Sequence, residues 1–231
     1  MNAQGLCDHF RSDVGDVVPD GAPHLWSDAE VLRYIGDAYF MFVRLIGGIP
    51  DFTSVATEVP IVAHEAVGEL HPSILRINQA QRESDAGVID ILNYTDLRKL
   101  TVGIGDYGQF QALKLDSLEG PVRYGIIGMQ RNTIRWVKVP LVNDTANLII
   151  HRMPFDPITA FDQEFVDVEE IHHLHLVNWM KYLAYSKQDT DAFDARKAAE
   201  YKGIFEQYCL FARSENERYK SKVRTTGYGG I

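Results

Sequence analysis

Two histidines on one predicted helix are the first residues in this sequence whose types and spacing could support chemistry. His172 and His175 stand three positions apart in a segment with helical periodicity, so both imidazoles would lie on one face. Two imidazoles at that spacing can bind a transition metal, which makes a metal-dependent hydrolase one hypothesis for this chain. No third ligand is indicated by its spacing, however. The alternative is that these are polar side chains on the first turns of a helix.

The other reactive residue types give weaker signals. His64 and Glu65 begin the zinc-protease motif H-E-x-x-H, but its fifth position is Gly68. Cys209 lies on an apolar helical stripe, and Cys7 lies in a segment that we interpret as an arm, so neither is a predicted nucleophile. We therefore expect no catalytic residue, no cofactor and no bound metal, and a protein that is not an enzyme.

The composition is that of a globular protein. The chain has 231 residues, of which 45% are hydrophobic and 24% charged, and this length allows one large domain or two small ones. The net charge is -9, which disfavours general binding to nucleic acid because phosphates would be repelled. Two distant cysteines form no disulfide framework, so we expect a reducing compartment. We see no signal peptide and no apolar run of membrane-spanning length, so we expect no membrane partner.

Helices are predicted near both ends of the chain. Residues 1–25 are acidic and contain Pro and Gly, so we interpret them as an N-terminal arm. Ser27 and Glu30 predict a capping box, and an apolar stripe follows until Gly47. A second N-terminal signature, residues 167–170, predicts a helix over about 168–187, with the stripe Ile171, Leu174, Met180 and Leu183. A last helix is expected from about 191, with the stripe Phe193, Ala198, Tyr201, Phe205, Cys209 and Ala212.

The middle of the sequence has the composition of a sheet. Between residues 53 and 155, β-branched and aromatic runs are separated by Gly, Pro or Asn-Asp, which predicts strands. Residues 106–118 are ambiguous. Because the strands follow one another closely, we expect antiparallel pairing. The predicted domains are an arm at 1–25, a helical domain at 26–52 and 156–222, a β-rich insertion at 53–155 and a tail at 223–231.

The predicted fold class is therefore α+β. It consists of an antiparallel helical bundle, made of one N-terminal and two long C-terminal helices, with a β-rich insertion and an extended C-terminal tail.

The C-terminal end differs from the rest of the chain. Residues 213–224 hold five basic and two acidic side chains, a net charge of +3 that leaves -12 on the remainder. The apolar stripe of the last helix stops near Ala212, whereas the helix-favouring composition continues to about Lys222. The following tail is glycine-rich and carries one aromatic anchor, Tyr228, which suits a segment that becomes ordered on a partner. The alternative is a frayed terminus without a role.

The order of these features resembles the head-to-tail adaptor (head–tail connector) proteins of tailed bacteriophages, in particular short-tailed phages. The resemblance rests on the helix from Trp26 to Ala38, the β-rich middle around residues 70–77, the closing helices from Glu170 to Arg213 and the basic tail. These stretches touch most of the chain, but each is a pattern and not a catalytic signature.

The resemblance implies a structural virion protein at the head–tail interface. Such adaptors form a dodecameric ring beneath the portal protein, continue the DNA channel and support the tail tube or nozzle, while DNA passes without sequence-specific binding. The resemblance also implies that the C-terminal tail docks on the portal. The residues assigned to this role are Arg224, Thr225, Thr226, Gly227, Tyr228, Gly229, Gly230 and Ile231. The β-rich middle would contact neighbouring subunits or the next tail ring. A different neck or tail-completion protein remains the structural alternative.

Overall fold

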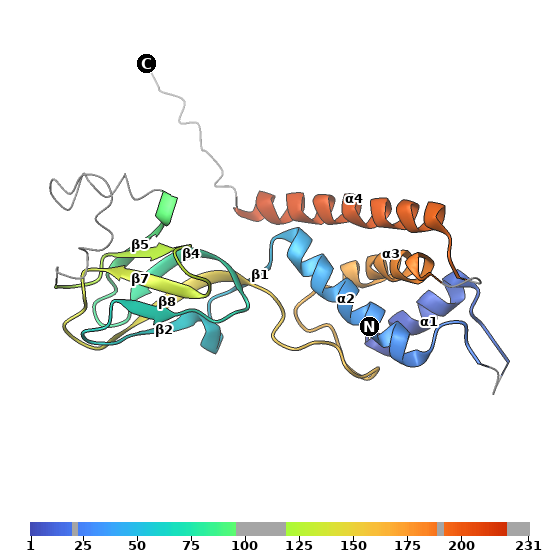
Figure 1. Ribbon diagram of the computed structural model, residues 1–231, viewed down its shortest axis with the longest axis horizontal. Helices are drawn as coiled ribbons and strands as arrows, with labels where there is room; N and C mark the ends of the chain where they lie inside the picture. The colour runs from blue at the N-terminus through green and yellow to red at the C-terminus, as the bar shows by residue number, and fades with distance from the viewer. Residues whose placement is uncertain (20–22, 96–118, 189–191, 221–231) are drawn as a thin grey trace, which may run out of the picture. The chain divides into compact units, whose positions relative to one another are not determined.

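The chain forms two compact units, a helical unit (Met1–Gly48 with Pro154–Ile231) and a β unit (Ile49–Met153). Figure 1 shows the computed structural model, which describes residues 1–19, 23–95, 119–188 and 192–220. Within these residues the fold is mixed α+β, with four α-helices and a curled eight-stranded sheet. The α+β class predicted from the sequence is therefore present.

The elements have the following bounds. The helices are α1 (Ala3–Val14), α2 (Asp28–Ile46), α3 (Glu170–Ser186) and α4 (Ala195–Lys220), with a short 3-10 helix η1 (Val55–Thr57). The strands are β1 (Ile49–Asp51), β2 (Glu58–Ile61), β3 (Val67–Glu69), β4 (Ile74–Arg82), β5 (Val88–Asn93), β6 (Tyr124–Ile127), β7 (Thr133–Val137) and β8 (Asp144–Arg152).

Helix α1 corrects the prediction that residues 1–25 are an unfolded arm. Asn2 caps the helix by accepting a hydrogen bond from the Gly5 amide, and Gly15 ends it in the left-handed conformation at φ 73°. The residues that α1 buries are spaced as on one helical face: Ala3, Leu6, Cys7 and Phe10. This apolar stripe is short, and a stretch containing Pro and Gly follows it. For that reason the sequence predicted an arm instead of a helix.

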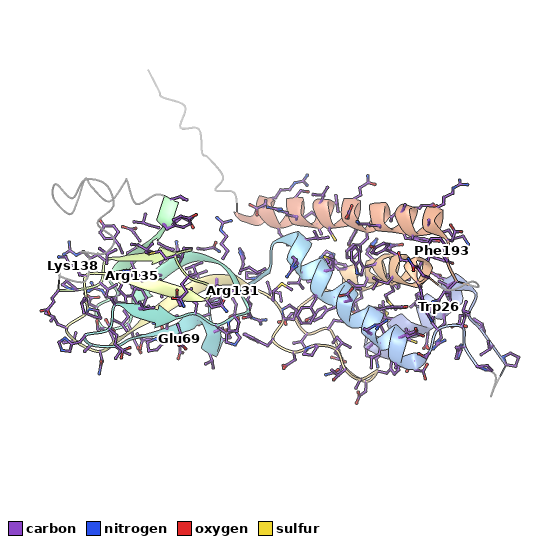
Figure 2. The ribbon with its side chains drawn as sticks, viewed as in Figure 1. Trp26, Glu69, Arg131, Arg135, Lys138 and Phe193 are labelled. Atoms are coloured by element: carbon purple, nitrogen blue, oxygen red, sulfur yellow. The ribbon has the colours of Figure 1, made fainter. Side chains whose placement is uncertain are left out.

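The buried guanidinium of Arg11 links α1 to the start of α2 by hydrogen bonds. Arg11 donates to Asp16 at 2.6 Å, to Asp28 at 2.6 Å and to the Trp26 carbonyl at 3.2 Å. Trp26 itself is buried (Figure 2), and its ring lies edge-on to Phe10. The ion pairs and the aromatic contact together fix the start of α2 against α1.

The capping box predicted for α2 is confirmed. The Ser27 hydroxyl accepts from the Glu30 amide, and the Glu30 carboxylate accepts from the Ser27 amide at 3.1 Å. Gly47, with φ 95°, ends the helix as expected.

The beginnings of α3 and α4 differ from the predictions. Glu169, not Asp167, occupies the N-cap position of α3, and Asp167 instead accepts a hydrogen bond from the Tyr39 hydroxyl. Helix α4 begins at Ala195, where the Asp194 carboxylate accepts from the amides of residues 196 and 197. Phe193, predicted on the apolar stripe of α4, therefore lies before the helix and is 56% exposed (Figure 2).

The strands lie in the order β1-β8-β4-β5-β6-β7-β3, and β2 also pairs with β8. The expectation of antiparallel pairing is correct for every described strand pair except β5–β6, which is parallel. A parallel pair needs a long crossover, and the connection from Asn93 to Tyr124 supplies one. The ambiguous residues 106–118 lie outside the described residues.

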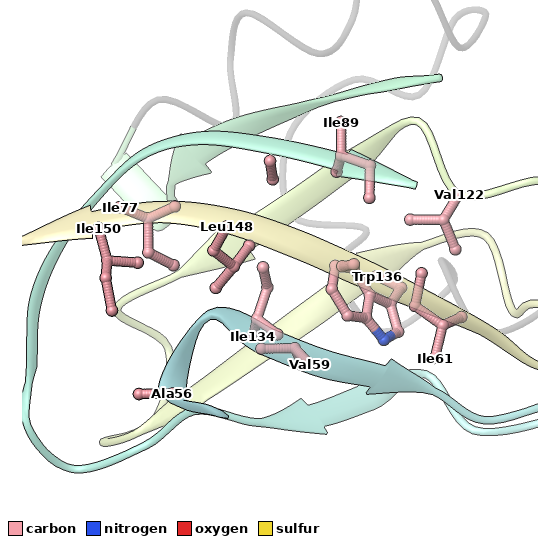
Figure 3. Close-up of a cluster of buried hydrophobic side chains, with 12 residues drawn as sticks. Ala56, Val59, Ile61, Ile77, Ile89, Val122, Ile134, Trp136, Leu148 and Ile150 are labelled. Carbon is pink, nitrogen blue, oxygen red and sulfur yellow. The ribbon is translucent and has the colours of Figure 1, made fainter. Parts of the chain in front are cut away.

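The curled sheet encloses the core of the β unit (Figure 3). Ile134, Trp136, Leu148 and Ile150 point into it with almost no exposed surface. Gly125 on β6 permits this packing, because a Cβ there would lie 2.6 Å from the Ile134 side chain. The interior of the curled sheet is therefore filled by packed hydrophobic side chains.

One buried ion pair joins β1 to β8. The Asp51 carboxylate accepts from Arg152 at 2.5 Å and from the amides of Thr53 and Ser54, so it also fixes the turn that leads to η1. Burial alone would raise the pKa of Asp51. The hydrogen-bond donors around the carboxylate have the larger effect, so its pKa lies well below the ordinary value.

Replacing Asp51 should destabilise the β unit in a pH-dependent way. Asp51→Asn is expected to lower the free energy of unfolding at pH 7 by about 3 kcal/mol, because the buried ion pair of Asp51 with Arg152 is lost. The difference from the unsubstituted protein should shrink below pH 4, roughly, where Asp51 in the unfolded chain becomes protonated. Urea unfolding at pH 7 and pH 3 measures both effects. Asp85→Asn, at an exposed ion pair with Arg82, is the control and should change the stability by less than about 1 kcal/mol.

Candidate functional site

The predicted portal-binding residues 224–231 lie outside the described residues, so the helix that leads to them is the nearest described feature. Ala212 is the last buried residue among those described in α4. From Arg213 to Arg218 each side chain is exposed or half-buried, as the polar sequence predicts. Helix α4 therefore continues beyond Ala212, the last described position at which it packs against the core of the helical unit.

Aromatic side chains attach α4 to α2 and α3. The ring of Phe205 is fully buried. Its centroid lies 5.1 Å from the ring centroid of Trp179 in α3 and 6.4 Å from that of Phe42 in α2. One turn later, Tyr208 stacks on His175 of α3 with a centroid distance of 3.4 Å. Figure 1 shows α4 extending beside α3. These contacts fix which faces of α4 are buried and which are presented to solvent.

The histidine pair meets a tyrosine. The His172 Nδ1 atom lies 2.8 Å from the Tyr208 hydroxyl, while the ring of His175 is nearly parallel to the Tyr208 ring at 15°. The helical spacing thus brings both imidazoles to one place, as expected. Among the described residues, His, Cys, Asp and Glu side chains form no group of three that could hold a metal ion. The contacts of this pair are those of helix packing.

Burial changes the protonation of this cluster. It lowers the pKa of both His172 and His175, and the charge of His172 lowers that of His175 further. Burial also raises the pKa of Tyr208. The cluster therefore favours two neutral imidazoles beside a neutral phenol, with His175 stacked on the ring and His172 hydrogen-bonded to the hydroxyl.

Both cysteines are buried thiols. Burial raises the pKa of Cys209 to about 12 and also raises that of Cys7. Because the thiolate is the reactive form, neither side chain is suited to nucleophilic chemistry. For Cys7 the reason differs from the predicted one, since it lies on the buried face of α1 and not in an arm.

Two residues of α3 that the sequence assigns to the core face solvent instead. Ile171 is 68% exposed and Leu174 is 53% exposed, whereas Met180 of the same predicted stripe is fully buried. Helix α3 is apolar on several sides, so its hydrophobic pattern did not identify the face that packs. The core side is formed mainly by His173, Leu176, Val177, Met180 and Ala184.

A family model described as SU10 adaptor protein matches residues 1–225 of the chain. The chain belongs to the SU10 adaptor protein family. A search of the curated proteins finds no match. Membership in the family indicates a structural adaptor of a bacteriophage, placed in the virion at the head–tail interface and interacting with portal and tail proteins. Among the helices of the described residues, none is long and apolar enough to cross a membrane.

The burial of the two thiols predicts their reactivity in this adaptor. A maleimide added to the native protein at pH 8 should modify neither Cys7 nor Cys209 within minutes, because both are inaccessible and protonated. In denaturant both should react at once. Intact mass spectrometry reads the number of adducts, and rapid modification of native Cys209 would contradict the described packing of α4.

The histidine cluster predicts that acidification weakens the helical unit. Folding lowers the pKa of His172 and His175, so the unfolded chain binds more protons as the pH falls through 6.5, and stability falls with it. Urea midpoints at pH 7.5 and pH 5.0 should therefore differ more for the unsubstituted protein than for His175→Phe. The control His9→Gln, at an exposed position of α1, should keep the full difference.

Proposed function

We propose that this adaptor forms a ring, expected to be a dodecamer, between the portal protein and the tail tube or nozzle. The ring would continue the DNA channel for genome retention and ejection. The observation that carries the proposal is the family match, which covers 225 residues of the chain. It places the chain among phage adaptors, and a ring of copies is the arrangement that can join a portal ring to a tail while leaving an axial channel open.

The charge of the chain supports a conduit for DNA. A net charge of -9 gives the assembled copies an acidic surface, and acidic walls repel phosphates. Basic walls would instead hold DNA through counterion release. The acidic composition therefore suits a passage through which DNA slides without sequence-specific binding.

We assign portal docking to residues 224–231. The support is the polar end of α4 beyond Ala212, followed in sequence by arginine, three glycines and one tyrosine. A helix that continues past its own core and leads to a basic, glycine-rich sequence can deliver that segment to a partner. The family match ends at Thr225, so the assignment of residues 226–231 rests on their own sequence. The β unit is then available to meet the next ring of the tail.

Removing the tail should abolish portal binding without affecting folding. A chain ending at Lys222 should keep the thermal midpoint of the full chain and should not co-sediment with portal rings of the same phage. In the full chain, Tyr228→Ala should weaken binding by roughly tenfold to a hundredfold, because an aromatic anchor is lost. Thr226→Ser is the matched control within the tail and should bind normally. Undiminished binding by the shortened chain would refute the assignment.

A further inference from the structure

The chain passes between the helical unit and the β unit at two places, after Gly48 and after Met153. Both crossings leave the β unit from neighbouring strands, because β1 pairs with the end of β8 and Ile49 lies opposite Arg152. The two crossings are therefore attached side by side at one end of the β unit. A domain that is inserted in this way can turn about its point of attachment.

Gly48 forms the first crossing. Its amide donates to the Val43 carbonyl at 2.9 Å, which closes the C-terminal cap of α2. The next residue, Ile49, already belongs to β1 and pairs with β8. The torsions of Gly48 are therefore the ones that separate the end of α2 from the sheet. Gly48 has a φ of 91°, and glycine has the widest range of backbone angles of any residue.

The second crossing is held more firmly. Met153 stays attached to the β unit, because its amide donates to the carbonyl before β4 at 2.8 Å and its carbonyl accepts from Arg152 at 3.2 Å. Ile158 is already buried in the helical unit, beside α2. Pro154 and Pro157 lie between these attachments, and each proline ring fixes φ at about −65°. This crossing therefore bends less than the one at Gly48.

The β unit is stiff at the end where the crossings are attached. Arg152, the last residue of β8, forms a buried ion pair with Asp51, the last residue of β1. The ion pair holds the two strands together directly beside the crossings, and the packed core of the curled sheet lies behind them. A rotation at Gly48 therefore carries the whole β unit with it.

We infer that Gly48 is a hinge about which the β unit turns as one rigid body, while residues 154–157 act as a restraint that limits the rotation. The hinge is a property of the single chain and does not depend on the ring. In the ring proposed above, it would let the β units adjust to a tail protein while the helical units keep their places.

The length of the β unit gives the hinge a measurable signature. Strand β8 has 9 residues between Asp144 and Arg152 and spans about 27 Å. A rotation of about 20° would displace the Asp144 end by about 9 Å, but the residues beside Arg152 by only about 1–2 Å. The displacement of a residue should therefore increase with its distance from the hinge.

Double electron–electron resonance between two spin labels on the full chain tests the hinge. One label is attached at Ala199→Cys in α4, and the second at either Arg76→Cys, near the hinge end of β8, or Val142→Cys, beside its far end. All three positions are exposed and the native thiols are buried, so only the new cysteines should be labelled. The distance distribution from α4 to position 142 should be several times wider than that to position 76. The control pair, Arg76→Cys with Val142→Cys, lies within the β unit and should give a narrow distribution.

The other outcomes each overturn the hinge. Narrow distributions for both pairs that join the two units would show that the units form one rigid body. Equally wide distributions at positions 76 and 142 would place the motion elsewhere than at Gly48. A wide distribution for the control pair would show that the β unit does not move as one body. In each of these cases the proposed ring would stand, because it does not require motion within the chain.

Discussion

The attachment of α4 through buried aromatic rings is the constraint on which the functional account depends. Phe205 lies between Trp179 and Phe42, and Tyr208 is held by His172 and His175. Burying such rings is worth several kcal/mol, whereas the polar end of α4 adds little of its own. Because the rings fix the rotation of α4 about its axis, they also decide that Phe211 and Leu210 face solvent on different sides.

This arrangement gives separate tasks to the two ends of one helix. The first part of α4 is a structural element of the helical unit, and the part beyond Ala212 leads away from its core toward the basic segment. A long helix is well suited to this division, since its hydrogen bonds are internal and it can extend past its own packing. The proposed docking of the tail on the portal therefore depends on this helix.

The sequence predicted the elements whose signals are local. The Ser27–Glu30 capping box and Gly47 stop are local chemistry, and α2 begins and ends where they indicate. Helix α1 was missed because its stripe is short and is followed by Pro and Gly. The parallel β5–β6 pair was missed because strand order depends on a crossover between residues distant in sequence.

The candidate surface was the least predictable part. In α3, Ile171 and Leu174 look like core residues, and His173 does not, yet His173 is buried and the other two are exposed. Local periodicity identifies apolar positions but cannot say which of several apolar sides meets a neighbouring helix. Only the packing of α3 against α1, α2 and α4 decides this, and the leftover apolar side then becomes a candidate for contact between molecules.

The position of this chain in the mature virion tests the central claim most directly. Cross-linking mass spectrometry on purified particles, combined with electron microscopy of particles labelled at this chain, would locate it. The account predicts a ring of copies at the head–tail vertex, cross-linked to the portal on one side and to a tail protein on the other. Absence of the chain from mature virions, or its location at the distal tail or on the capsid surface, would contradict the account.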